Sequence, residues 1–197
     1  MADFIEGKRP VIEALRTGVP IKSILMADNV QRDGLIEDIL RKAKRAGATV
    51  EMVPRKVLDG KSDRGSHQGV MAKAAPFPYV GIGDVIDAAG KSAEQHDGRA
   101  LVIILDHITD AGNLGAVSRS AEAVACGIVI PNKRSAHVEA STYKSSAGAI
   151  AHVPVAQVSN LVQTMSRLKE EGFWIAGATE HAKDLIWKSN LKGKIAL

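Results

Sequence analysis

The residues best suited to chemistry lie in a loop and in the helix expected after it, residues 106–123. Asn113 and Arg119 stand six residues apart there, and Gly112 and Gly115 permit close approach of a ligand to the backbone. Free N–H groups at a helix start attract phosphate, and an arginine offers a planar fork of donors. The same pattern is equally typical of an ordinary helix start, with Asn113 as its N-cap and Arg119 in a structural role.

Other titratable residues give weaker signals. His107 lies in the same loop, but we disfavour it as a general base because no orienting partner is visible. Asp106 and Asp110 are better explained by capping and loop structure than by metal binding, and no metal site is predicted. Lys133 and Arg134 form a short basic turn, for which phosphate contact and simple solvation are equally good interpretations.

Several residues favour structural roles or exclude common cofactor sites. Cys126 follows a helix in an apolar context and is expected to be buried and inert. Trp174 and Trp187 have the chemistry to stack on bases, but Trp174 sits in a strand pattern that favours the core. The sequence contains no Walker loop, no Gly-x-Gly-x-x-Gly and no zinc-ligand spacing.

The elements that must position these residues alternate between strand and helix. Residues 1–75 are expected to form a small α/β domain, with strands at 21–27, 50–53 and 69–75. Prolines and glycines then indicate a connection over 76–98, although the helix near 82–89 can belong to either side. Residues 99–197 are expected to form an open parallel sheet, with strands at 100–105 and 127–131, a short strand within 152–158, a strand at 173–178 and the start of a fifth at 194–197. A helix is expected over 139–150.

Composition and charge support a packed protein with an anionic partner. Apolar residues make up 45% of the 197 residues and charged residues 24%, and no apolar run approaches the roughly 20 residues that span a bilayer. The net charge of +4 lies entirely in residues 1–75, where 14 Lys and Arg face 10 Asp and Glu. Such a surface attracts polyanions, although it is also typical of an ordinary solvated face. A single cysteine makes a reducing cytoplasm the default location.

Several segments together resemble one family. The pattern Asn113-x-Gly115-x-x-x-Arg119-Ser-Ala, after a hydrophobic strand, resembles the first motif of SpoU/TrmH enzymes. These are S-adenosylmethionine-dependent RNA 2′-O-ribose methyltransferases of the knotted SPOUT superfamily. Residues 129–136, 144–149 and 152–155 are similar to later family segments, and residues 7–15 and 67–70 resemble the substrate-binding domain of its ribosomal RNA branch.

The resemblance assigns roles to particular residues. Arg119 matches the catalytic arginine and Asn113 orients the loop and the substrate. Because a guanidinium is a poor base, Arg119 is expected to stabilise the developing 2′-alkoxide. The resemblance further implies one set of RNA-binding residues: Arg9, His67, Gln68, Gly115, Lys133 and Arg134. It places the edge of the S-adenosylmethionine pocket at Gly177, Ala178 and Thr179.

The chain also departs from the family pattern. The Gly-Ser-Glu-Gly-like turn and the Ser-Leu-Asn run of the family are absent, so we expect a C-terminally truncated chain without the knot-forming part. Most of the cofactor pocket is then expected beyond Leu197, and this chain is expected to bind S-adenosylmethionine weakly or not at all. Residues 124–127 are also about one residue shorter than the usual spacing.

Two functions from different classes fit these observations. The first is 2′-O-ribose methylation of RNA, expected to be ribosomal, by an enzyme that is a homodimer in its full-length form. The second is a non-catalytic RNA-binding or ribosome-assembly protein on the same fold. A small-molecule enzyme on a doubly wound fold lacks a recognisable site in this sequence.

Overall fold

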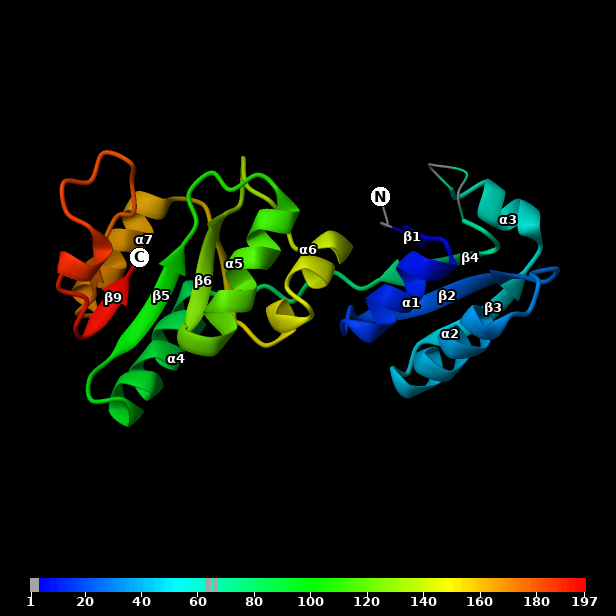
Figure 1. The fold of residues 1–197 in the computed structure, drawn as a ribbon, viewed down its shortest axis with the longest axis horizontal. Helices are drawn as coiled ribbons and strands as arrows, with labels where there is room; N and C mark the ends of the chain where they lie inside the picture. Colours follow the sequence, from blue (N-terminus) through cyan, green and yellow to red (C-terminus); the bar gives the residue numbers. More distant parts are fainter. Residues whose placement is uncertain (1–3, 63–64, 66) are drawn as a thin grey trace. The chain divides into compact units, whose positions relative to one another are not determined.

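A computed structural model describes residues 4–62, 65 and 67–197. They divide into two compact units, the first made of residues up to Phe77 with Glu139–Lys144, the second of Pro78–Val138 with Ser145–Leu197. Each unit has its own sheet flanked by helices, which confirms the predicted α/β class (Figure 1). Among the described residues, no helix combines the length and the apolar character needed to cross a membrane.

The sheet of the first unit has four strands in the order β1-β4-β2-β3. The elements of this unit are β1 Phe4–Glu6, α1 Lys8–Arg16, β2 Ile21–Ala27, α2 Gly34–Arg45, β3 Thr49–Val53, α3 Arg55–Asp59 and β4 Val70–Ala74. Strands β2 and β3 run parallel, and β4 runs antiparallel to both β2 and β1. The strands predicted at 21–27, 50–53 and 69–75 are therefore confirmed.

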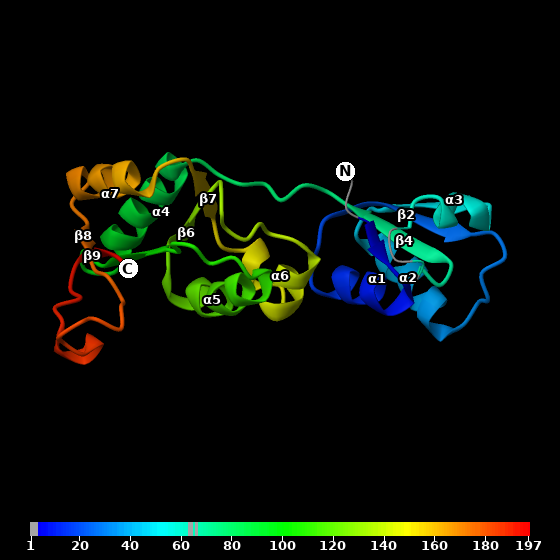
Figure 2. The same ribbon diagram turned by 90° about the horizontal axis from the view of Figure 1, so that it is seen from above.

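The core of the first unit lies on both faces of its sheet, because successive residues of a strand point to opposite sides. On one face Leu25, Val53 and Met71 pack with Leu58 of the short helix α3. Helices α1 and α2 cover the other face (Figure 2). Helix α2 buries Ile36, Ile39 and Ala43, which recur at helical spacing.

The second unit has a parallel sheet of five strands in the order β7-β6-β5-β9-β8. Its elements begin with α4 Ile82–Gln95, β5 Ala100–Ile104, α5 Ala111–Val124, β6 Gly127–Pro131 and the 3-10 turn η1 Ala149–Ala151. Helix α6 Ala140–Ser145 lies between β6 and η1 in the chain, and all of it except Ser145 belongs to the first unit. The elements of the second unit continue with β7 Val155–Val158, α7 Leu161–Glu170, β8 Trp174–Ile175, the 3-10 turn η2 Ile186–Lys188 and β9 Lys194–Ala196. The short strand that starts at Lys194 is thus the predicted fifth strand of the sheet.

Helices cover both faces of this sheet. Figure 2 shows α4 and α7 on one face and α5 on the other. Val85 and Ala89 of α4 and Leu168 of α7 are fully buried against Val102 and Val129 of the strands. This double cover explains why the strand segments are almost purely apolar in sequence.

The strand order reverses next to β5. From β5 the chain builds outward through β6 and β7, and then adds β9 and β8 on the other side of β5. In open parallel sheets, ligands bind beyond the carboxyl ends of the strands where the order reverses. The loop after β5, residues 105–110, and the residue after β9, Leu197, lie at that edge.

Three expectations differ from the structure. The expected connection over 76–98 contains helix α4, which belongs to the core of the second unit because its apolar face packs on the sheet. The helix expected over 139–150 is interrupted after Ser145, since Ala147 and Gly148 adopt positive φ angles of 52° and 89°. Trp174 is 75% exposed rather than buried, because β8 is a short strand at the sheet edge.

Candidate functional site

Asp110, rather than Asn113, is the N-cap of helix α5. Its side chain accepts a hydrogen bond from the Asn113 N–H at 2.7 Å. Gly112 leaves room for this cap, since a Cβ there would lie only 3.0 Å from Asp110 Oδ1. The interpretation of Asn113 as N-cap is therefore wrong. An anion approaching this helix start would also meet the carboxylate of Asp110, which weakens the case for a phosphate site there.

Helix α5 presents two of the predicted site residues to solvent. Asn113 and Arg119 are exposed, whereas the buried positions of the helix are Leu114, Gly115, Ser118 and Ala121. Gly115 therefore offers no exposed surface to a ligand. Within the described part of the chain, the Arg119 guanidinium has no hydrogen-bond or ion-pair partner, so its five N–H donors are available to a substrate.

The loop after β5 and the basic turn after β6 are joined by hydrogen bonds. The carbonyl of Ile108 accepts from the Ala136 N–H at 2.7 Å and from the Ser135 hydroxyl at 3.3 Å. Both loops follow the carboxyl ends of neighbouring strands. Lys133 and Arg134 are exposed in this turn, and so the structure brings them to the sheet edge that also carries the loop before α5.

His107 has an orienting partner that the sequence pattern did not reveal. Its Nδ1 lies 2.6 Å from Oδ1 of Asp106, and both side chains are exposed. A histidine whose Nδ1 is held in this way keeps Nε2 for proton transfer, which is one requirement for a general base. The expectation that His107 lacks an orienting partner is therefore wrong, although no contact links this pair to Arg119.

The three predicted cofactor residues line a hollow. Gly177, Ala178 and Thr179 follow β8, and together with Leu197 after β9 they border a cavity of about 340 Å³. Glu180 and Asp184 also border it. This volume falls within the usual range for a small-molecule site, roughly 300–1,000 Å³. The cavity lies at the carboxyl edge of the sheet and carries acidic side chains, which suit a positively charged ligand such as a sulfonium.

A larger hollow of about 680 Å³ lies elsewhere on the second unit. It runs along β5 and β9 beside the end of α5, and Val124, Ile186 and Leu191 supply much of its apolar lining. Of the predicted site residues it contains none. We therefore place the candidate site at the smaller hollow. No three His, Cys, Asp or Glu side chains gather as a metal site in residues 4–62, 65 and 67–197.

The predicted RNA-binding residues of the first unit fall into two groups. Arg9 and Gln68 are exposed, but His67 is only 2% exposed. The His67 Nε2 lies 2.9 Å from Asp59 Oδ1, and its Nδ1 accepts from the Gly69 N–H at 3.0 Å. Because both ring nitrogens are engaged and the ring is buried, the prediction that His67 touches RNA is corrected. Its two contacts join Asp59 to the Gly69 N–H, next to Gln68.

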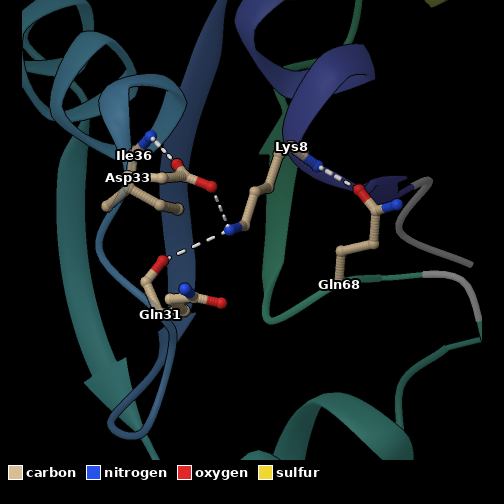
Figure 3. Close-up of polar contacts among 5 residues, drawn as sticks. All are labelled: Lys8, Gln31, Asp33, Ile36 and Gln68. Atoms are coloured by element: carbon tan, nitrogen blue, oxygen red, sulfur yellow. Dashed lines mark hydrogen bonds and ion pairs between the residues drawn. The ribbon is translucent and has the colours of Figure 1, made fainter.

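Sequence reasoning missed one group of contacts. Lys8, Gln31 and Asp33 meet at the starts of α1 and α2, where Lys8 also contacts Gln68 (Figure 3). Lys8 and Asp33 lie 25 residues apart, and no local spacing pattern connects residues so distant. By contrast, an aspartate three residues before Asn113 is a usual capping signal, so the cap at Asp110 could have been found.

Comparison with known families matches both units. Residues 4–80 match the family described as RNA 2′-O ribose methyltransferase substrate binding. Residues 100–197 match the SpoU rRNA methylase family. The chain is 38% identical over 183 residues to YacO of Bacillus subtilis, a protein assigned to the TrmH family of tRNA/rRNA methyltransferases. The match covers 92% of this chain and 71% of YacO. A TrmH-family protein of Staphylococcus aureus is also 38% identical, covering 88% of this chain and 68% of that protein.

Solved structures share the fold. The SpoU methyltransferase AviRb of Streptomyces viridochromogenes, solved with S-adenosylmethionine, superposes with a TM-score of 0.64 at 18% identity, covering 98% of this chain and 71% of AviRb. An rRNA methyltransferase of Sinorhizobium meliloti superposes with a TM-score of 0.58 at 22% identity, covering 98% of this chain and 68% of that one. At these identities the likeness establishes the architecture.

The matches of the substrate-binding unit and of the parallel-sheet unit define the chain as an RNA methyltransferase. The chain belongs to the SpoU/TrmH family. S-adenosylmethionine is the methyl donor that this family uses.

Proposed function

We propose that the protein transfers a methyl group to a ribose 2′-oxygen of RNA, and that the RNA is ribosomal. The observation that carries this proposal is the carboxyl edge of the second sheet. There the cavity bordered by Gly177, Ala178 and Thr179 lies beyond β8 and β9, and the loop after β5 leads into the helix that presents Arg119. Both features stand where a parallel sheet binds ligands.

The cavity is proposed to form the edge of the S-adenosylmethionine site that lies within this chain, and its acidic lining suits the charge of the donor. Its volume of about 340 Å³ holds one small molecule, and the carboxylates of Glu180 and Asp184 complement a cation. The backbone of residues 177–179 would hold the donor at the sheet edge. When bound, S-adenosylmethionine supplies an electrophilic methyl group on a positively charged sulfur.

The protein's own contribution is electrostatic and positional. As the ribose 2′-oxygen takes the methyl group, the methyl–sulfur bond would break, the sulfur would leave as a neutral thioether and the 2′-hydroxyl proton would pass to water. Negative charge therefore develops on the 2′-oxygen as its proton leaves. Arg119 is proposed to donate hydrogen bonds to this oxygen or to the adjacent phosphate, which lowers the free energy of the transition state. Asn113 is exposed on the same helix and is proposed to orient the ribose. Lys133 and Arg134 are proposed to contact the RNA backbone.

The first unit is proposed to grip the RNA. Its excess of positive charge and its exposed Arg9 and Gln68 support phosphate and base contacts. We further propose that the enzyme in its full-length form acts as a homodimer in the cytoplasm. Light scattering coupled to size-exclusion chromatography measures the molar mass and therefore tests whether the enzyme is a homodimer.

Transfer of tritium from the methyl group of S-adenosylmethionine to transcribed ribosomal RNA tests the proposal. A 2′-O-methyl group blocks alkaline cleavage of the adjacent phosphodiester, so the labelled product should survive as alkali-resistant dinucleotides. Label that is released as single nucleotides would indicate a methylated base and contradict the 2′-O assignment. Salt-dependent RNA binding without transfer would favour the non-catalytic RNA-binding or assembly role instead.

A further inference from the structure

Lys8 is a basic residue whose ammonium group donates hydrogen bonds within the first unit. Its side chain is only 15% exposed, and its Nζ donates to the Gln31 carbonyl at 3.2 Å and to Asp33 Oδ2 at 2.8 Å (Figure 3). An ammonium group with these two acceptors is poorly placed to serve as a free phosphate contact. Lys8 instead ties the first residue of α1 to the loop that precedes α2.

Lys8, Gln31 and Asp33 together form a joint between the starts of α1 and α2. Asp33 uses both carboxylate oxygens in this joint. While Oδ2 accepts from Lys8, Oδ1 accepts from the Ile36 N–H at 3.0 Å and caps α2. The hydrogen bond from Lys8, followed by that from the Ile36 N–H, holds the pKa of Asp33 below its ordinary value. The charged pair thus fixes the starts of two helices relative to one another.

Gln68 is attached to the same joint. The N-cap of α1, Gly7, has no side chain, and the Lys8 N–H donates to Gln68 Oε1 at 3.3 Å instead. Gln68 has a φ of +50°, which is uncommon outside glycine, and the buried His67 and the Gly69 N–H on either side hold it there. With Oε1 directed at α1, the NH₂ group of this exposed side chain keeps two donors for a ligand.

Two arginines are direct sequence neighbours of the joint. Arg9 follows Lys8 and Arg32 precedes Asp33, and both are exposed. Neither has a hydrogen-bond or ion-pair partner among residues 4–62, 65 and 67–197. Arginine is well suited to phosphate because its fork of donors matches two oxygens.

We propose that Lys8 and Asp33 are positioning residues of an RNA-binding edge formed by Arg9, Arg32 and Gln68. Lys8 makes no RNA contact. It holds the two helix starts so that the Gln68 NH₂ group donates to an acceptor atom of the RNA while the two arginines meet phosphates. This inference rests on the proposed RNA-binding role of the first unit and assigns Arg32 a contact that the sequence did not suggest.

The charge-neutral double variant K8M/D33N tests the proposal. It removes one positive and one negative charge, so electrostatic attraction alone predicts unchanged RNA affinity. The asparagine side chain introduced by D33N can still cap α2. The proposal predicts a loss of about tenfold in the affinity for transcribed ribosomal RNA, measured by filter binding, because the donors of the edge lose their alignment. The control K22M/E51Q removes one positive and one negative charge at two exposed residues, Lys22 of β2 and Glu51 of β3, which make none of these contacts. It should bind RNA within about twofold of wild type.

Single variants separate positioning from direct contact. Removing the Asp33 charge in D33N should weaken RNA binding, whereas a carboxylate that only repelled RNA would give stronger binding when removed. R32M and R9M should each lower the slope of log affinity against log salt by about 0.7–0.9, the value for one lost phosphate contact.

A variant of Gln68 tests the edge without disturbing the joint. Q68E keeps an acceptor for the Lys8 N–H but removes both donors, and the predicted loss of affinity is about tenfold or more with an unchanged melting temperature. T49E adds the same charge at an exposed strand position and controls for repulsion. Affinity of Q68E equal to that of T49E, or unchanged or stronger binding by K8M/D33N, would overturn the inference. Wild-type chain that shows no salt-dependent RNA binding would instead overturn the proposed function, and the inference with it.

Discussion

Replacing the buried His67 by alanine should destabilise the first unit selectively. The ring is 2% exposed, its Nδ1 accepts from the Gly69 N–H, and its Nε2 contacts Asp59. Alanine leaves the buried Gly69 N–H without its acceptor, which costs about 1–3 kcal/mol, and adds the loss of packing around the missing ring. The Asp59 side chain is 57% exposed and regains water, so this contact adds little. The sum is about 2–4 kcal/mol of unfolding free energy.

Hydrogen exchange of the amides in β4 measures this loss within the first unit. A change of about 2–4 kcal/mol corresponds to protection factors lower by roughly 30- to 700-fold, if β4 exchanges through opening of that unit. His152 is exposed in the second unit, and H152A should leave these amides unchanged. Protection in H67A within about threefold of wild type would refute a structural role for His67 and reopen its assignment to RNA contact.

Three further predictions follow from particular contacts. D110A should lower the unfolding free energy of the second unit by about 1 kcal/mol in urea denaturation, because the Asn113 N–H loses its cap, and D110N should restore most of it. G69A should destabilise the first unit by at least about 1 kcal/mol, since a Cβ would lie 2.9 Å from Val30 Cγ2 at a φ of +82°. Because the folded pKa of Asp33 lies below its ordinary 3.8, its stabilisation is present above that pH and is lost as the pH falls through the folded value. The difference in melting temperature between wild type and D33N should therefore be full at pH 6 and shrink as the pH falls below 3.8.

Much of the architecture can be predicted from the sequence because it follows from local patterns. The apolar runs at 21–27 and 100–105 become central strands, and the spacing of Ile36, Ile39 and Ala43 becomes the buried face of α2. The alternation of strands and helices is sufficient to predict a parallel sheet in the second unit.

What escaped prediction depends on contacts between distant residues. The position of β9 beside β5 decides that Trp174 stands on an edge strand, and the strand pattern around Trp174 contains no information about that. His67 is buried and its ring meets Asp59 and the Gly69 N–H, and Lys8 forms an ion pair with Asp33. For His67, a polar residue was predicted to contact RNA although tertiary structure supplies its partners.

The rate of methyl transfer by Arg119 variants tests most directly whether Arg119 takes part in catalysis. If Arg119 stabilises charge on the attacking 2′-oxygen, R119A should lower kcat by about 10²–10³ while RNA affinity changes only a few-fold. R119K should recover part of the rate, since an ammonium offers charge without the planar fork. Transfer at the wild-type rate by R119A, or a loss that appears entirely in RNA affinity, would contradict this account.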